Sequence, residues 1–298
     1  MHIKIATAPC SWGVWYADGT PSGTPARLFL DQAREAGYKA LELGPDGYLP
    51  EDREALREEL SRRGLEAASG TACYRFDQYE KFDDFRPAVE KLCARVASMG
   101  GKYLVTMDES DVGRYSEKKA GYTPAVWNKY HAMFRELGEF TRREFGLMTV
   151  YHPHIKSLIE TEEEIVRLLD ATGLNLCFDT GHHAYVNGNG RHGDPSVPDF
   201  IRRYAERVKY LHFKQVDGEV YARVQREHLD SDTAFDIDVM CDLPDGIIDF
   251  KAVRQALEDI HFEGIGVVES DMPKASNEKA FASACRNLSY LREIGMIE

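Results

Sequence analysis

Short apolar stretches alternate with longer amphipathic stretches along the whole chain. In the longer stretches, apolar residues recur every three or four positions, as from Phe250 to Ile260, which predicts helices. The short stretches predict eight strands: Ile3–Ala8, Ala40–Leu43, Glu66–Ser69, Tyr103–Thr106, Met148–Tyr151, Leu176–Phe178, Val208–His212 and Gly266–Glu269. Eight strands that alternate with helices favour an α/β fold, a single-domain (β/α)8 TIM barrel.

Helix boundary signals support this alternation. The pairs Thr24–Pro25 and Thr123–Pro124 each predict an N-cap residue followed by proline at the first helical position. Residues Thr161–Glu164 form a capping-box sequence, and Gly173 predicts the end of the same helix. The helices between the strands therefore have defined starts and stops.

An open doubly wound sheet is the alternative architecture. Such a sheet carries a glycine-rich phosphate-binding turn after its first strand. Residues Ala8–Gly13 read APCSWG instead, and no Walker-type sequence occurs elsewhere. Because no linker or low-complexity segment interrupts the chain either, we expect one barrel over residues 1–298.

Composition and charge narrow the functional classes. Of the 298 residues 43% are hydrophobic, enough for a large core, and we find neither an apolar membrane-spanning run nor a secretory signal. The net charge of −13 opposes binding to nucleic-acid phosphates. Six cysteines without a C-x-x-C pair indicate reduced thiols. We expect a cytoplasmic enzyme with no membrane or nucleic-acid partner.

Two connections are long for a barrel, Pro9–Gly23 after the first strand and Lys214–Gly246 after the seventh. Both follow carboxyl ends of strands, where TIM barrels carry their active sites. The first contains Trp12, Trp15 and Tyr16. These aromatic side chains form either a substrate-binding wall for sugar stacking or the packing of the loop itself.

Polar residues follow the last four strands. Because the carboxyl ends of parallel strands share one rim, their side chains should converge, and imidazole with carboxylate suits a divalent ion such as Mn²⁺, Co²⁺ or Zn²⁺. Each residue also has a simpler explanation when it is considered alone. A histidine such as His152 can be an ordinary hydrogen-bonding residue, Asp179 can cap a helix, and Glu269 can pair with a lysine. Their conjunction favours a metal site, with four predicted ligands: His152, Asp179, His212 and Glu269.

Several short motifs resemble those of the xylose isomerase-like TIM-barrel superfamily, which contains sugar isomerases, epimerases and endonuclease IV. Within it, the sequence is most similar to inosose (2-keto-myo-inositol) dehydratases, and the resemblance covers nearly the whole chain. The motifs, in order, are Ala8–Trp12, Glu42–Gly44, Tyr151–His154, Asp179–His182, His212–Lys214, Pro244–Phe250 and Val267–Glu269, followed by the tail Glu269–Asn277.

The resemblance implies one divalent metal ion, Mn²⁺ or Co²⁺ first and Mg²⁺ or Zn²⁺ as alternatives, held by the four predicted ligands. It implies a lyase or isomerase that acts on a keto-sugar or keto-cyclitol through an enediolate, and it implies a homo-oligomer. Loss of water gives a dehydratase, which we favour. The alternatives are an isomerase or epimerase without elimination, and a β-elimination lyase acting on 3-keto-glycosides.

The sequence departs from the dehydratase pattern at the expected rim. Gln215 stands where an aspartate is usual, Glu269–Met272 reads ESDM, and Ile155–Ser157 reads IKS after His154. These differences leave the substrate and the reaction type open.

Four further residues are candidate catalytic groups. Glu42 is either a proton shuttle or a residue that orients the substrate. His154 and His182 each bind a substrate hydroxyl or act as an acid, although His182 can instead cap a helix. Lys214, two residues after His212, should face the same side of its strand and so lie near a developing oxyanion or leaving group. The alternative for Lys214 is a surface ion pair.

Two other functions are weighed against this one. A DNA-repair endonuclease of the same superfamily needs three zinc ions and histidines on the second and third strands, which this chain lacks there. We therefore reject it. A non-catalytic sugar-binding barrel remains an alternative that turnover measurements decide.

Overall fold

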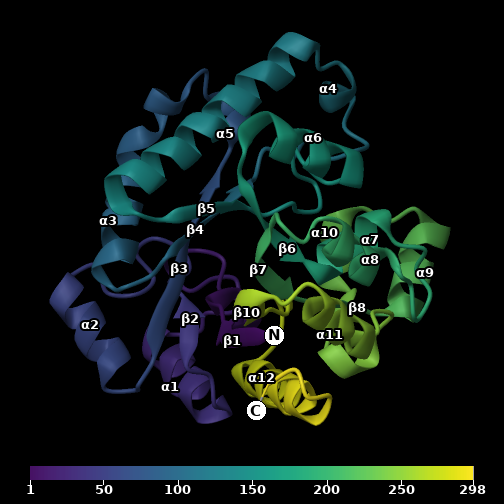
Figure 1. The fold of residues 1–298 in the computed structure, drawn as a ribbon. Coiled ribbons are helices and arrows are strands. Elements are labelled where there is room, and N and C mark those ends of the chain that lie inside the picture. Colours follow the sequence, from purple (N-terminus) through teal and green to yellow (C-terminus); the bar gives the residue numbers. More distant parts are fainter. Residues whose placement is uncertain (298) are drawn as a thin grey trace.

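The computed structural model describes residues 1–297 and forms a closed barrel of eight parallel strands surrounded by helices (Figure 1). The barrel order is β1-β10-β7-β6-β5-β4-β3-β2, so the first and last strands pair and close the ring. The strands are β1 (His2–Thr7), β2 (Ala40–Glu42), β3 (Glu66–Tyr74), β4 (Tyr103–Asp108), β5 (Met148–Tyr151), β6 (Asn175–Asp179), β7 (Val208–Phe213) and β10 (Glu263–Val268). The predicted single-domain TIM barrel is confirmed.

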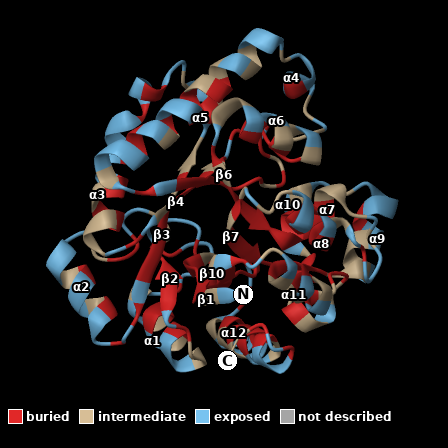
Figure 2. Cartoon of the chain, in the orientation of Figure 1, coloured by how far each residue is buried: buried red, intermediate tan, exposed pale blue. Residues whose placement is uncertain are grey.

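Helices fill the connections between the strands and form the outer layer (Figure 1). They are α1 (Ala26–Ala36), α2 (Arg53–Ser61), α3 (Arg86–Ser98), α4 (Glu117–Ala120), α5 (Pro124–Phe145), α6 (Glu162–Thr172), α7 (Thr180–Asn187), α8 (Ser196–Arg203), α9 (Gly218–Glu227), α10 (Ser231–Asp236), α11 (Phe250–Asp259) and α12 (Asn277–Glu293). Buried residues line the strands and the inner faces of these helices, and exposed residues cover their outer faces (Figure 2).

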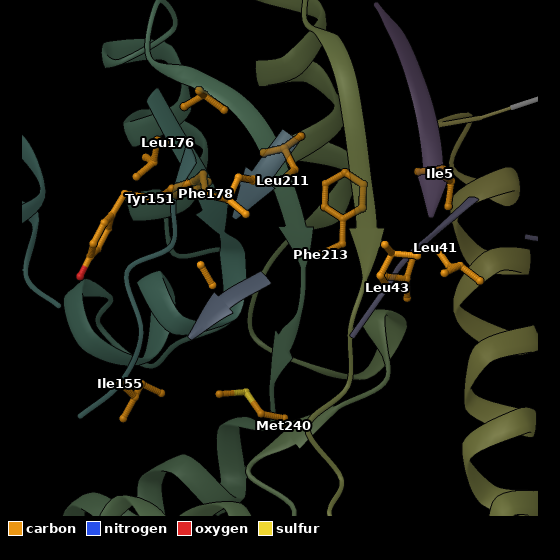
Figure 3. Packing of buried hydrophobic residues seen from close by; sticks show 14 of the residues in the cluster. Ile5, Leu41, Leu43, Tyr151, Ile155, Leu176, Phe178, Leu211, Phe213 and Met240 are labelled. Atoms are coloured by element: carbon orange, nitrogen blue, oxygen red, sulfur yellow. The ribbon is translucent and has the colours of Figure 1, made fainter. Parts of the chain in front are cut away.

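Each barrel strand contributes to two apolar layers, because successive side chains point to opposite faces. On β7, Leu211 and Phe213 pack outward in the large cluster beneath the helices (Figure 3), whereas Tyr210 belongs to a separate small cluster. This small cluster fills the barrel interior with one residue from each strand: Ala6, Ala40, Ala68, Val105, Val150, Cys177, Tyr210 and Val267.

The predicted helix boundaries hold with one exception. The capping box at Thr161 is present and Gly173 ends α6 in the left-handed conformation. Thr123 is the N-cap of α5. The prediction for α1 is wrong by one position, because Pro25 occupies the N-cap. Thr24 instead donates its hydroxyl to the backbone oxygen of Trp12, which ties the first loop to the start of the helix.

The long connection after β7 contains ordered elements. It holds α9 and α10, and the antiparallel pair β8 (Gln215–Val216) and β9 (Met240–Cys241). Gln215 is completely buried, and its amide nitrogen donates to the backbone oxygens of Leu243 and Ile248 at 2.9 Å. Gln215, which stands where the resemblance expects an aspartate, therefore stabilises the loop.

Ion pairs attach α10 to its surroundings. Lys156 Nζ lies 2.8 Å from Asp232 on one side of the helix. Lys274 pairs with Asp236, its Nζ 2.8 Å from the carboxylate. Partly exposed pairs of this kind contribute only about 0–1 kcal/mol each.

Among residues 1–297, no helix has the length and apolarity that crossing a membrane requires.

His183 on α7 should make the fold sensitive to acid. Its ring packs between Phe178 and Phe200, with centroids 4.9 and 4.7 Å away, and burial lowers its pKa from 6.5 to about 4. Below pH 6.5 the unfolded chain binds a proton that the folded chain rejects, so stability falls as the pH falls, by about 1.4 kcal/mol per pH unit. His183→Phe should abolish up to about 3 kcal/mol of this loss between pH 6.5 and 4.

Urea unfolding of both proteins across this pH range measures the effect. The exposed His2 provides the control, because His2→Gln should leave the pH dependence of the wild type unchanged. Equal acid sensitivity in wild type and His183→Phe would contradict the assignment.

Candidate active site

A polar layer lies directly above the small interior cluster, at the carboxyl end of the barrel. Residues two positions apart on a strand share a face, so the residue two positions after an interior apolar residue also points inward. Applied to Ala40, Val150, Cys177, Tyr210 and Val267, this alternation places five polar residues in one layer: Glu42, His152, Asp179, His212 and Glu269. Each of these side chains is at most 5% exposed.

The four predicted metal ligands lie together in this layer. His152 Nε2 is 3.4 Å from Asp179 Oδ2, and His212 Nδ1 is 3.8 Å from the same oxygen. His212 Nδ1 also lies 3.0 Å from Glu269 Oε2. The four side chains come from β5, β6, β7 and the end of β10, so the barrel brings together residues that are up to 117 positions apart in the printed sequence.

Lys214 lies within this group of side chains. Its Nζ is 3.1 Å from Asp179 Oδ2, 3.1 Å from Glu269 Oε2 and 2.7 Å from Asp271 Oδ2. It also lies 3.0 Å from His182 Nε2. Lys214 is only 1% exposed, so the alternative of a surface ion pair is wrong. It shares the inward face with His212, as the alternation along β7 indicates.

The neighbouring charges fix the ionisation of Lys214 and Asp179. Burial disfavours the ammonium, but Asp179, Asp271 and Glu269 hold the pKa of Lys214 well above its usual value. Burial likewise disfavours the Asp179 carboxylate, and His182 and Lys214 nevertheless hold its pKa well below the usual range. Lys214 is thus a cation at neutral pH and can donate protons in hydrogen bonds, but it is a poor base.

His154 and His182 are neutral imidazoles beside this ammonium. Their ring centroids are 3.9 Å apart. Burial lowers the pKa of both rings, that of His154 to about 3. His154 Nδ1 lies 2.7 Å from the Ile155 carbonyl oxygen, so Nδ1 carries the proton and Nε2 is left unprotonated. His182 accepts a hydrogen bond from Lys214 through Nε2, which leaves its Nδ1 protonated.

Asp179 has two functions in the structure. Its Oδ1 accepts a hydrogen bond of 2.8 Å from the backbone N–H of His182 and caps α7, while Oδ2 faces the metal-ligand group. His182 lies in the first turn of α7, but its side chain points to Lys214 and takes no part in capping. Helix capping and site formation are therefore compatible.

The residues fit a divalent cation. Three buried carboxyl groups, those of Asp179, Glu269 and Asp271, surround Lys214, and burying this excess of negative charge is costly without a further cation. The unpartnered buried Nδ1 of His212 faces Asp179 and Glu269, and it makes no hydrogen bond despite its 3.0 Å separation from Glu269. Nitrogen and oxygen donors of this kind suit Mn²⁺, Co²⁺ or Zn²⁺.

The aromatic residues of the first loop differ in how far they are buried. Trp12 is completely buried, its ring packs edge-on against Phe29 at 5.0 Å, and its Nε1–H donates to Gln32. The expectation that Trp12 stacks on a sugar is therefore wrong, because neither ring face is accessible. Trp15 and Tyr16 are 39% and 62% exposed, and their role in substrate binding remains a proposal.

The sequence analysis missed two residues of the site. Asp271 contacts Lys214, and the alternation from Glu269 to Asp271 was a usable signal for it. Cys10 donates its thiol to Glu269 Oε1 at 3.3 Å, and nothing in its sequence context indicates this contact.

Comparison with known proteins agrees with this geometry. Residues 30–293 match the family described as xylose isomerase-like TIM barrel. The chain belongs to this family. The rhizopine catabolism protein MocC of Rhizobium meliloti is 30% identical over 282 residues, covering 91% of this chain and 82% of that protein. An inosose dehydratase of Geobacillus kaustophilus is 28% identical over 283 residues, covering 92% of this chain and 89% of its own.

Solved structures share the fold at lower sequence identity. The IolI protein, whose crystal structure holds a zinc atom, matches with a TM-score of 0.72 at 15% identity over 99% of both chains. An L-ribulose 3-epimerase matches with a TM-score of 0.70 at 17% identity, over 98% of this chain and 94% of that one. The resemblance noted from the motifs is thus confirmed at the level of family and fold.

Proposed function

We propose that the protein is a divalent-metal-dependent enzyme that eliminates water from a keto-sugar or keto-cyclitol, as an inosose dehydratase does. The observation that carries this proposal is the position of Lys214, an ammonium bound to two of the four metal ligands and to a neutral histidine. The chain is an enzyme of the lyase or isomerase kind, in keeping with relatives named inosose dehydratase. The specific reaction and substrate are our proposal.

The metal would be held by the four predicted ligands, His152, Asp179, His212 and Glu269. A divalent ion bound there polarises a substrate carbonyl and stabilises negative charge on its oxygen. From the family resemblance we assign Mn²⁺ or Co²⁺ first, with Mg²⁺ or Zn²⁺ as alternatives; nitrogen and oxygen donors can bind each of these ions.

Residues next to the ligands would move the protons. We assign removal of the proton from the carbon beside the carbonyl to His154, because its Nε2 is unprotonated and free to accept it. The electron pair of that C–H bond would then form the enediolate. As the enediolate returns to a carbonyl, its C=C electron pair shifts to form a double bond to the next carbon, whose hydroxyl leaves as water with a proton from Lys214, while His182 would bind a substrate hydroxyl. Glu42, the fourth candidate catalytic group, lies in the same polar layer.

A second outcome follows from the same site. If the proton returns to a neighbouring carbon and no group leaves, the reaction is an isomerisation or epimerisation; if an alkoxyl leaves, it is cleavage of a 3-keto-glycoside. The epimerase among the structural neighbours makes the first alternative worth testing. Mass spectrometry distinguishes dehydration from isomerisation. Dehydration removes the mass of one water molecule from a keto-inositol, whereas isomerisation leaves the mass unchanged.

The helix α10 lies beside these groups. The ring of Phe235 on α10 lies 6.4 Å from the rings of both His154 and His182. Because the side chains of the site are nearly inaccessible, the proposed reaction includes displacement of this short helix when substrate binds. Phe235 would then face the apolar side of a bound sugar ring.

Removal of metal tests the proposal. Dialysis against a chelator should abolish turnover of an inosose, and Mn²⁺ or Co²⁺ should restore it, with metal content followed by elemental analysis. Full activity in metal-free protein would end the metal-dependent mechanism. Normal sugar affinity in metal-free protein without turnover of any keto-sugar would favour a binding protein instead.

A further inference from the structure

Glu42 lies at an irregular end of β2. The pairing with β3 joins Leu41 to Ala67 and then Glu42 to Ser69, so one residue of β3 is skipped at this point. The side chain of Glu42 is 3% exposed and points into the barrel interior. The irregular register thus brings a carboxylate beside His212 of the metal-ligand group.

Four donors hold the Glu42 carboxylate. Its Oε1 accepts hydrogen bonds from Tyr210 Oη at 2.8 Å, Ser69 Oγ at 3.0 Å and His212 Nε2 at 3.2 Å. Its Oε2 accepts from Thr71 Oγ1 at 3.4 Å. All of these donors belong to the barrel itself, and each is on a strand that fixes its position.

The contact with His212 determines which nitrogen of that ring carries a proton. A carboxylate oxygen only accepts, so His212 must donate from Nε2. The other nitrogen, Nδ1, faces Asp179 and Glu269, so a metal ion would bind at this atom in place of an Nδ1 proton. A carboxylate that orients a metal-binding histidine in this way also makes it a stronger ligand.

The same contacts argue against Glu42 as a proton shuttle. Both of its oxygens are already occupied by hydrogen bonds that four groups on the barrel strands donate. Glu42 also makes no contact with Lys214 or His182 among the interactions of residues 1–297, whereas those two residues contact each other. Among the proposed metal ligands, the one to which Glu42 hydrogen-bonds is His212.

We infer that Glu42 is a positioning residue for the metal, acting through His212 and not through the substrate. It fixes the tautomer and orientation of His212 so that Nδ1 is ready to bind a divalent cation. This inference rests on the proposed metal site. Co²⁺ binding by the wild type tests that site separately, because a wild-type protein that binds no Co²⁺ would refute the metal site itself.

Glu42→Gln tests the inference with Co²⁺, whose visible absorption reports binding directly. The substitution keeps the size of the side chain and removes its charge. The Kd for Co²⁺ should rise on the order of 10- to 100-fold, while kcat at saturating Co²⁺ should stay within about threefold of the wild type, a range far below the loss of an acid–base group. Tyr210→Phe, which removes one donor to Glu42, should shift the Kd in the same direction by a smaller factor.

Asp108→Asn is the matched control, because Asp108 is another buried carboxylate that bonds Ser110, Phe76 and Leu158 but no metal ligand. Its Kd for Co²⁺ should equal that of the wild type. An unchanged Kd in Glu42→Gln, with kcat about 100-fold lower or more at saturating metal, would overturn the inference and restore Glu42 as a proton shuttle. A loss of kcat of that size alongside a raised Kd would also overturn it.

Discussion

Asp179→Asn is expected to release most of the bound metal while the barrel stays folded. The amide can still accept the hydrogen bond that Asp179 Oδ1 receives from the His182 N–H, because asparagine caps helices about as well as aspartate. The negative charge of the proposed ligand is lost. Removing a group that only hydrogen-bonds to a metal ligand lowers metal affinity about 10- to 100-fold. Because Asp179 is itself a proposed ligand, its loss should lower the affinity by more than this, and turnover should fall as well.

Elemental analysis of the purified variant and its thermal unfolding midpoint together measure this result. Asp179→Ala provides the contrast, because it removes both the charge and the helix cap and should also lower the unfolding midpoint. Glu269→Gln, which removes a charged ligand without affecting a cap, should resemble Asp179→Asn. Wild-type metal content in both charge-removing variants would show that these carboxylates are not ligands.

Lys214→Met is expected to abolish most turnover and to leave metal occupancy intact. Methionine fills a similar volume, but no ammonium remains to donate to the leaving group or the developing oxyanion. Loss of such a group typically costs about 10²- to 10⁴-fold in rate. Metal content should not fall. The ammonium of Lys214 competes with a bound cation for the carboxylates of Asp179 and Glu269, and the substitution removes this competition. Loss of metal in this variant would contradict the role assigned to Lys214.

Stability provides a second measurement on Lys214→Met. In metal-free protein the variant leaves three carboxylates without their shared cation, so it should unfold more easily by about 3–5 kcal/mol. Added metal should restore much of this stability. Lys119→Met is the matched control, because Lys119 is also buried and pairs with Glu164 at 2.8 Å outside the site. Its instability should not respond to metal.

Much of the fold could be predicted because each strand repeats one simple pattern. Alternation of side chains placed His152, Asp179 and His212 on the inner face of their strands, and the shared rim of a parallel barrel brought them together. The same rule placed Lys214 beside them. These predictions needed only the identity of the strands and their parallel order.

Other features depend on tertiary contacts that periodicity does not encode. Trp12 is buried by α1, and Thr24 bonds the loop instead of capping a helix. Gln215 directs its amide to two backbone carbonyls of a loop whose path the sequence did not reveal. The environment of Glu42 arises from the skipped residue in β3, which no local pattern signals.

The distribution of the proposed ligands over β5, β6, β7 and β10 has a consequence for assembly of the protein. No two of them are on one strand, so a high-affinity cation site exists only after the second half of the barrel has closed. A cation that binds the native state alone shifts the folding equilibrium by RT ln(1 + [L]/Kd), about 2.7 kcal/mol at a hundredfold excess over Kd. Cellular metal supply would then govern how much of this polypeptide survives proteolysis, in addition to how fast it turns over substrate.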